Sequence, residues 1–134
     1  MADMSGAGDT TRVTTYLVTG GTGFLGRHLV DLLTAREEAK VLVLVRPGSV
    51  AKLARLGDRV EPLVGDLTEP MLGVGEEDRE RLRSGVDHFV HLAALYDMTA
   101  DAATNEATNI GGTTEALMLA ADLQAGCFHH VSSV

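Results

Sequence analysis

Residues 14–26, TTYLVTGGTGFLG, decide the fold of this chain. Their first half is rich in β-branched residues and ends at glycines, which predicts a strand over Val13–Thr19. The residues after the glycines place leucines at helical spacing and predict a helix over Phe24–Arg36. The stretch therefore predicts a strand, a glycine-rich turn and a helix in direct succession.

The glycines of this turn fit two spacings that are used to bind phosphates. Three of them satisfy G-x-G-x-x-G, and a fourth adds the spacing G-x-x-G-x-x-G. Glycine permits a tight turn, a close approach of a diphosphate to the backbone, and close packing of the helix on the strand. The start of the helix adds free N–H groups and a partial positive charge. We therefore expect a dinucleotide to contact Thr19, Gly20, Gly21, Thr22, Gly23, Phe24, Leu25, Gly26 and Arg27.

Strands and helices alternate along the rest of the chain. Apolar or β-branched runs predict strands at 41–45, 60–64, 86–92 and 127–131. Helices are expected at 49–56, 76–83 and 101–125, and Gly126 stands where the C-terminal glycine of the last one belongs. Pro62 cannot donate to a ladder and marks the third strand as an edge. The expected fold class is α/β, a doubly wound parallel sheet of the Rossmann type with strand order 3-2-1-4-5.

The end of the second strand indicates which dinucleotide is bound. An Asp or Glu there would bond the ribose 2′-OH of NAD, but the sequence has Val45-Arg46-Pro47. Arg46 can pair with a 2′-phosphate, and Arg27 can add a second positive charge. We therefore expect NADP(H) rather than NAD(H), with solvated surface arginines as the alternative interpretation. A P-loop is a poor match, because Arg27-His28 stands where Lys-Ser/Thr is required.

Composition argues against several other classes of protein. The 134 residues carry 19 acidic and 11 basic side chains, and this net charge of −8 argues against nucleic-acid and anionic-membrane partners. No apolar run approaches the roughly 20 residues that cross a bilayer. The single cysteine, Cys127, excludes an internal disulfide and favours a reducing, cytoplasmic setting. Residues 1–12 are expected to form a flexible polar tail ahead of a nucleotide-binding domain over 13–134.

Several motifs together resemble the extended branch of the short-chain dehydrogenase/reductase superfamily. The segment TGGTGFLG over 19–26 is similar to the nucleotide loop of that branch, and Gly65-Asp66-Leu67 is similar to its adenine-contacting segment. The resemblance implies that Asp66 meets the adenine amino group, with Leu67 beside it. An aspartate in this place can also simply cap a turn.

The end of the fourth strand also fits the branch. His91-Leu92-Ala93-Ala94 resembles its H-x-A-A motif, in which small residues let the backbone approach the ribose of the cofactor. The resemblance implies that Leu92, Ala93 and Ala94 contact the cofactor, and we expect His91 to be structural rather than catalytic.

Two further positions match residues that act on the substrate in this branch. Asn109-Ile-Gly-Gly-Thr113 resembles the N-V-x-G-T of the long helix, which implies that Asn109 organises the active site. A buried polar residue with a local partner is the equally weighted alternative. Ser133, with Ser132 as second choice, matches the catalytic Ser/Thr whose hydroxyl hydrogen-bonds the substrate carbonyl.

The segments FLGRHLV at 24–30 and VLVLVRPGS at 41–49 look most like the thioester and fatty-acyl reductases of this branch. Those enzymes reduce an activated acyl group with NADPH, so the resemblance implies an oxidoreductase acting on acyl-thioester or aldehyde-type carbonyls. A sugar-nucleotide epimerase or dehydratase and a non-catalytic NADP(H)-binding protein are the alternatives.

The Tyr-x-x-x-Lys pair of the superfamily is missing, since neither Tyr16 nor Tyr96 is followed by lysine four residues later. We therefore expect these residues to be the N-terminal, nucleotide-binding portion of an oxidoreductase, inactive alone, with the proton donor and substrate-binding part beyond Val134. The fifth strand would then expose an edge through which the chain could self-associate. No metal-ligand set is expected.

Overall fold

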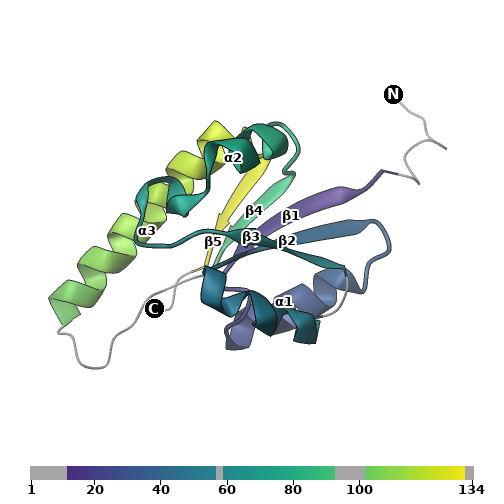
Figure 1. Cartoon of the computed structure of the whole chain (residues 1–134), viewed down its shortest axis with the longest axis horizontal. Helices are drawn as coiled ribbons and strands as arrows, with labels where there is room; N and C mark the ends of the chain where they lie inside the picture. Colours follow the sequence, from purple (N-terminus) through teal and green to yellow (C-terminus); the bar gives the residue numbers. More distant parts are fainter. Residues whose placement is uncertain (1–11, 57–58, 93–101, 132–134) are drawn as a thin grey trace.

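The computed structural model describes residues 12–56, 59–92 and 102–131 (Figure 1). It contains a five-stranded sheet in the order β3-β2-β1-β4-β5, in which every neighbouring pair is parallel. The strands are β1 (Thr14–Thr19), β2 (Ala39–Val45), β3 (Val60–Val64), β4 (His88–His91) and β5 (Cys127–His130). The predicted α/β class and strand order are confirmed, and Pro62 does lie on an edge strand.

Helices cover the two faces of the sheet separately (Figure 1). One face carries α1 (Phe24–Thr34) and the 3₁₀ segment η2 (Pro47–Leu56). The other carries the 3₁₀ segment η3 (Pro70–Gly73), α2 (Glu76–Leu82) and α3 (Ala102–Asp122). None of these described helices is long and apolar enough to cross a membrane.

Each face has its own apolar core. Beneath α1 and η2, valines of the central strands are fully buried, among them Val18, Val41 and Val43. Beneath η3, α2 and α3, the buried set includes Leu17, Leu42, Phe89 and Leu119. Successive residues of β1 and β2 therefore point to opposite cores, which explains the uninterrupted apolar runs Leu17–Val18 and Val41–Val45.

The long helix ends differently from the sequence prediction. It stops at Asp122, and Gln124 rather than glycine takes the left-handed conformation, with φ 55°. The Gln124 and Ala125 N–H groups donate to the Ala121 and Ala120 carbonyls, which is the Schellman pattern. Gly126 has another role, because a Cβ there would lie 2.8 Å from the Asp87 carbonyl oxygen. The glycine therefore admits the close approach of the segment that leads into β4.

Candidate dinucleotide-binding site

The turn between β1 and α1 requires glycine at specific positions. Gly20 has φ 77°, and its carbonyl accepts a hydrogen bond from the Gly23 N–H at 3.1 Å. A Cβ at Gly26 would overlap that carbonyl, and a Cβ at Gly21 would lie 2.7 Å from Val43 Cγ1. Side chains at either position would force the helix away from the strand, so the glycines fix the position of the start of α1.

The first turn of α1 is free of groups that would compete with an anion. Gly23 is its N-cap residue, with no side-chain cap hydrogen bond and no acidic residue in the first turn. The first backbone bond of the helix runs from the Arg27 N–H to the Gly23 carbonyl, at 2.9 Å. The preceding N–H groups have no intrahelical acceptor, which makes the end of this helix suitable for a phosphate.

A cavity of about 280 Å³ lies at the carboxyl ends of β1, β2 and β3. Ligands of doubly wound sheets bind outside the carboxyl ends of the strands, which is where this cavity lies. The residues that line the cavity are Gly20, Thr22, Leu44, Val45, Arg46, Ser49, Lys52, Gly65, Asp66, Leu67 and Thr68. The structure thus brings together the glycine turn, the end of the second strand and the predicted adenine-contacting segment.

The charges around this cavity are mixed but well defined. Arg46 and Lys52 line it as cations and Asp66 as an anion. Asp66 Oδ1 accepts hydrogen bonds from the Thr68 hydroxyl at 2.6 Å and the Thr68 N–H at 2.9 Å. These bonds, aided by the positive charge of Arg46, hold the pKa of Asp66 below its ordinary value against the effect of burial. Asp66 is therefore a carboxylate that both caps a turn and faces the cavity.

His91 lies at the junction of three elements and is 1% exposed. A 2.7 Å hydrogen bond joins its Nδ1 to the Thr19 hydroxyl on β1, and its Nε2 lies 3.4 Å from the Thr113 hydroxyl on α3. Burial, with a smaller effect of nearby His130, lowers the pKa of His91 to about 4. A neutral imidazole that ties β1, β4 and α3 together supports the structural role expected for this residue.

The remaining predicted contacts are distributed around the site. Leu92 is half-buried and donates its N–H to the Thr19 hydroxyl at 3.2 Å. Phe24, Leu25 and Arg27 are exposed on α1 and do not line the cavity. Asn109 is half-buried on α3. Ala93, Ala94, Ser132 and Ser133 lie outside the described residues, so their roles stay predictions.

Sequence reasoning missed Ser49 and Lys52 as cavity residues. Both lie in η2, which begins directly after Arg46. In a 3₁₀ helix, side chains three residues apart lie above one another, so the spacing of Arg46, Ser49 and Lys52 was the signal. It was not recognised because the segment was expected to be an ordinary helix that starts at Ser49.

Comparisons with known proteins give a consistent result. A family model described as male sterility protein, an NAD-binding family, matches residues 18–134. A linear gramicidin synthase protein of Brevibacillus parabrevis is 32% identical over an alignment 149 residues long, which covers 100% of this chain and 3% of that protein. The L-2-aminoadipate reductase large subunit of Penicillium chrysogenum is 34% identical over 136 residues, which cover 89% of this chain and 10% of that protein.

A solved structure shares the same architecture. The terminal R domain from the myxalamid PKS-NRPS biosynthetic pathway superposes with a TM-score of 0.73 at 31% identity. The match covers 93% of this chain and 36% of that domain. The chain therefore spans little more than a third of this solved R domain and a tenth or less of the two curated relatives.

Proposed function

Because this chain belongs to the male sterility protein family, within the extended short-chain dehydrogenase/reductase superfamily, we propose that it is the nucleotide-binding portion of an NADP(H)-dependent reductase. The observation that carries the proposal is the cavity at the carboxyl ends of β1–β3, which joins the glycine turn to Arg46 and Asp66. We propose that residues 13–134 belong to this nucleotide-binding domain and that it works in the cytoplasm.

The residues of the site fit a dinucleotide in three ways. Gly21 and Gly26, where a Cβ would meet Val43 or the Gly20 carbonyl, let α1 begin close to the sheet, and the start of α1 supplies N–H donors for a diphosphate. Asp66 is held as an anion that can accept a hydrogen bond from the adenine amino group. When bound, the reduced nicotinamide would supply a hydride.

The preference for NADP(H) rests on the cations beside the cavity. Arg46 follows β2, where an acid would select the 2′-OH of NAD, and Lys52 lines the same cavity. A 2′-phosphate carries up to two negative charges, so two neighbouring cations favour it over a hydroxyl.

The proposed reaction class is the reduction of an acyl thioester or aldehyde-type carbonyl. The names of the relatives support it, since one is an aminoadipate reductase and the solved neighbour is the terminal R domain of a biosynthetic pathway. In this proposal Ser133, or Ser132, hydrogen-bonds the substrate carbonyl, and Asn109 helps to organise the active site.

The experiment that tests the cofactor proposal is calorimetric titration of the chain with NADPH and with NADH. We expect NADPH to bind more tightly, and Arg46→Ala to weaken NADPH binding by about ten- to a hundredfold, because a charged hydrogen bond is lost. NADH binding should change little. Lys40→Ala is the matched control, since Lys40 lies near the opposite end of β2, outside the cavity, and is paired at 3.7 Å with Glu61. Equal affinities for the two nucleotides, or an equal effect of both variants, would contradict the proposal.

We also propose that the edge of β5 allows two copies of the chain to associate. β5 is the last strand of the described sheet, and an exposed edge presents unpaired backbone groups. Light scattering over a range of concentrations tests this, with a rise in mass expected. A constant monomer mass would contradict it.

A further inference from the structure

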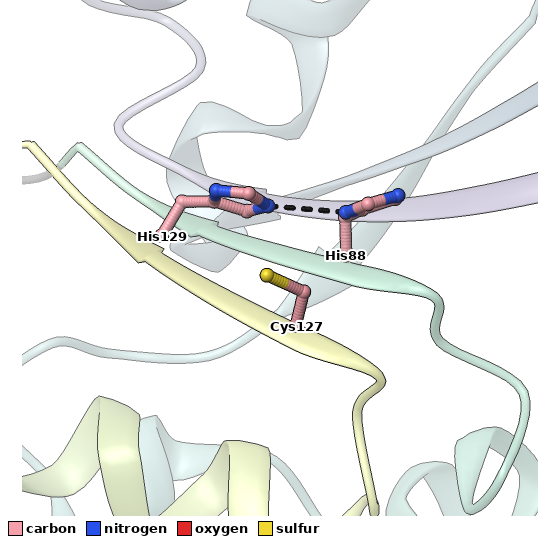
Figure 2. A group of neighbouring side chains, drawn as sticks. All are labelled: His88, Cys127 and His129. Carbon is pink, nitrogen blue, oxygen red and sulfur yellow. Dashed lines mark hydrogen bonds between the residues drawn. The ribbon is translucent and has the colours of Figure 1, made fainter.

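Three side chains that the nucleotide site does not use converge on one face of the paired strands β4 and β5. The parallel register pairs His88 with Cys127, and Val90 with His129. Because alternate residues of a strand share a face, Cys127 and His129 lie on the same side of β5, beside His88. Figure 2 shows the two imidazoles pointing toward one another with the Cys127 sulfur beside them. The topology therefore gathers two nitrogens and a sulfur from separate strands.

The distances within this cluster are close to those of a metal site. The ligand atoms of His88, Cys127 and His129 all lie within 4.8 Å of one another, and His88 Nδ1 lies 3.0 Å from His129 Nε2. Zinc bonds of about 2.0–2.3 Å in a tetrahedron place ligand atoms about 3.5 Å apart. Small side-chain rotations would therefore bring all three atoms to bonding distance.

The surroundings hold one ligand in place and leave the others accessible. The His88 ring stacks on Tyr16 of β1, with centroids 5.1 Å apart and an interplanar angle of 15°. His88 is half-buried, while Cys127 and His129 are exposed, so an ion can enter from solvent. The cluster starts at the amino ends of β4 and β5, whereas the nucleotide cavity lies at the carboxyl ends of β1–β3.

We propose that His88, Cys127 and His129 form a binding site for Zn²⁺, with His88 Nδ1, Cys127 Sγ and His129 Nε2 as ligands and a fourth position open to water. Imidazole and thiolate together favour zinc among the abundant divalent ions, because Mg²⁺ and Ca²⁺ select oxygen. On binding, the Cys127 thiol releases its proton to water as the metal–sulfur bond forms. Each imidazole stays neutral, with its proton on the ring nitrogen that is turned away. The ion would fasten β5 to β4.

The first test is titration of the metal-free chain with Co²⁺, a spectroscopic substitute for zinc. We expect one ion per chain, a cobalt–thiolate charge-transfer band in the near ultraviolet, and loss of the band when Zn²⁺ is added. Groups that only hydrogen-bond to a metal ligand are worth about ten- to a hundredfold in affinity, so loss of a direct ligand should weaken binding at least tenfold. This applies to His88→Gln and His129→Gln, while Cys127→Ser should also abolish the band.

His130→Gln is the matched control, because His130 is the next residue on β5 and faces His91 on the opposite side of the sheet. It should bind Co²⁺ like the unaltered chain. A second measurement does not depend on replacing the cysteine: Zn²⁺ should slow the reaction of Cys127 with a thiol reagent, and His88→Gln should remove that protection. Absence of the band, its persistence in Cys127→Ser, or an equal loss in His130→Gln would overturn the proposal. NADPH titration of the same variants should show unchanged affinity, which separates this site from the nucleotide site.

Discussion

The two halves of the sheet differ in how they are covered. One row of side chains crosses all five strands in register, Pro62–Val43–Val18–Val90–His129. Val43 and Val18 are fully buried beneath α1, Val90 is half-buried, and Pro62 and His129, on the two edge strands, are exposed. The β1–β2 part of this face is therefore core, and the β4–β5 part faces a groove of about 810 Å³ in the described structure.

Each half of the sheet consequently carries a distinct kind of site. Around β1 and β2, burial on both faces fixes the backbone, and the nucleotide cavity is built from backbone turns and residues at strand ends. Around β4 and β5, the uncovered face carries histidines and a cysteine. Burial of such polar side chains costs free energy, whereas accessible ones can bind a ligand. Strand composition reflects this, since β2 has the sequence AKVLVLV whereas β4 and β5 have HFVH and CFHH.

The largest effect that we predict concerns His91, which joins the two halves. The pKa of His91 is about 4 in the folded chain, whereas that of an ordinary histidine is 6.5. Between these pH values the unfolded chain therefore binds one proton that the folded chain does not. The contribution of His91 to stability should therefore be constant above pH 6.5 and fall by about 3 kcal/mol in total as the pH drops toward 4. Urea unfolding measured at intervals from pH 7.5 to pH 4 would show this loss.

The control for this prediction uses the slope rather than the absolute stability. His91→Gln removes the titrating group. The slope of the unfolding free energy against pH should therefore fall across this interval by the amount that corresponds to about one bound proton, whatever the effect of the substitution at pH 7. His28→Gln, at an exposed position on α1, is the matched histidine replacement for the comparison of slopes. An unaltered slope in His91→Gln would show that other groups cause the acid sensitivity.

The next effect compares the two halves directly through Val43→Ala and Val90→Ala. Val43 is fully buried and supports Gly21 of the nucleotide turn, so its truncation should cost about 2 kcal/mol and weaken NADPH binding. Val43 and Val90 both pair with Val18, on opposite sides of β1, but Val90 is only half-buried. Its truncation should cost less than about 1 kcal/mol. Equal costs in urea unfolding would show that the β4–β5 face is covered in solution.

The fold was largely predictable because its signals are local. Glycines after the first strand and alternating strand and helix periods are visible directly in the sequence, and Pro62 identifies the edge strand. The end of α3 was not predictable in this way. Gln124 adopts the left-handed conformation and donates a backbone bond that glycine more often provides, while its side chain accepts a bond from the Ser84 hydroxyl at 2.6 Å. That bond spans forty positions in sequence, so no local pattern announces it.

The candidate sites divide in the same way. Arg46 and Asp66 were found because each closely follows a strand, and parallel strand ends meet at one edge. Lys52 was missed because the segment after Arg46 forms a 3₁₀ helix, in which Arg46, Ser49 and Lys52 follow at intervals of three, rather than the ordinary helix expected from Ser49. The His88–Cys127–His129 cluster was missed because it depends on the pairing register of β4 with β5, which the sequence spacing does not contain.

The smallest effect concerns Asp66, which lines the nucleotide cavity beside the buried β1–β2 part of the sheet. The Thr68 hydroxyl bond is the main cause of its lowered pKa, so Thr68→Ala should raise that pKa toward its ordinary value, as carbon NMR of the carboxyl group would show. A carboxyl group whose pKa is lowered by folding stabilises the protein at pH values above its ordinary pKa, and this stabilisation is lost as the pH falls through the pKa of the folded state. The variant should therefore have a smaller stabilisation of this kind. Thr34→Ala is the control, since the Thr34 hydroxyl bonds the Val30 carbonyl instead.

The same Thr68→Ala variant distinguishes the two roles of Asp66. Both bonds from Thr68 end on Oδ1, so the proposed contact with adenine falls to Oδ2. The Thr68 N–H remains in the variant and still orients the carboxylate, so NADPH affinity should fall by no more than about threefold. A much larger loss would mean that the hydroxyl, rather than the strand end, positions Asp66 for the nucleotide. The geometry of the nucleotide site at the β1–β2 part of the sheet would then depend in part on a single exposed hydrogen bond.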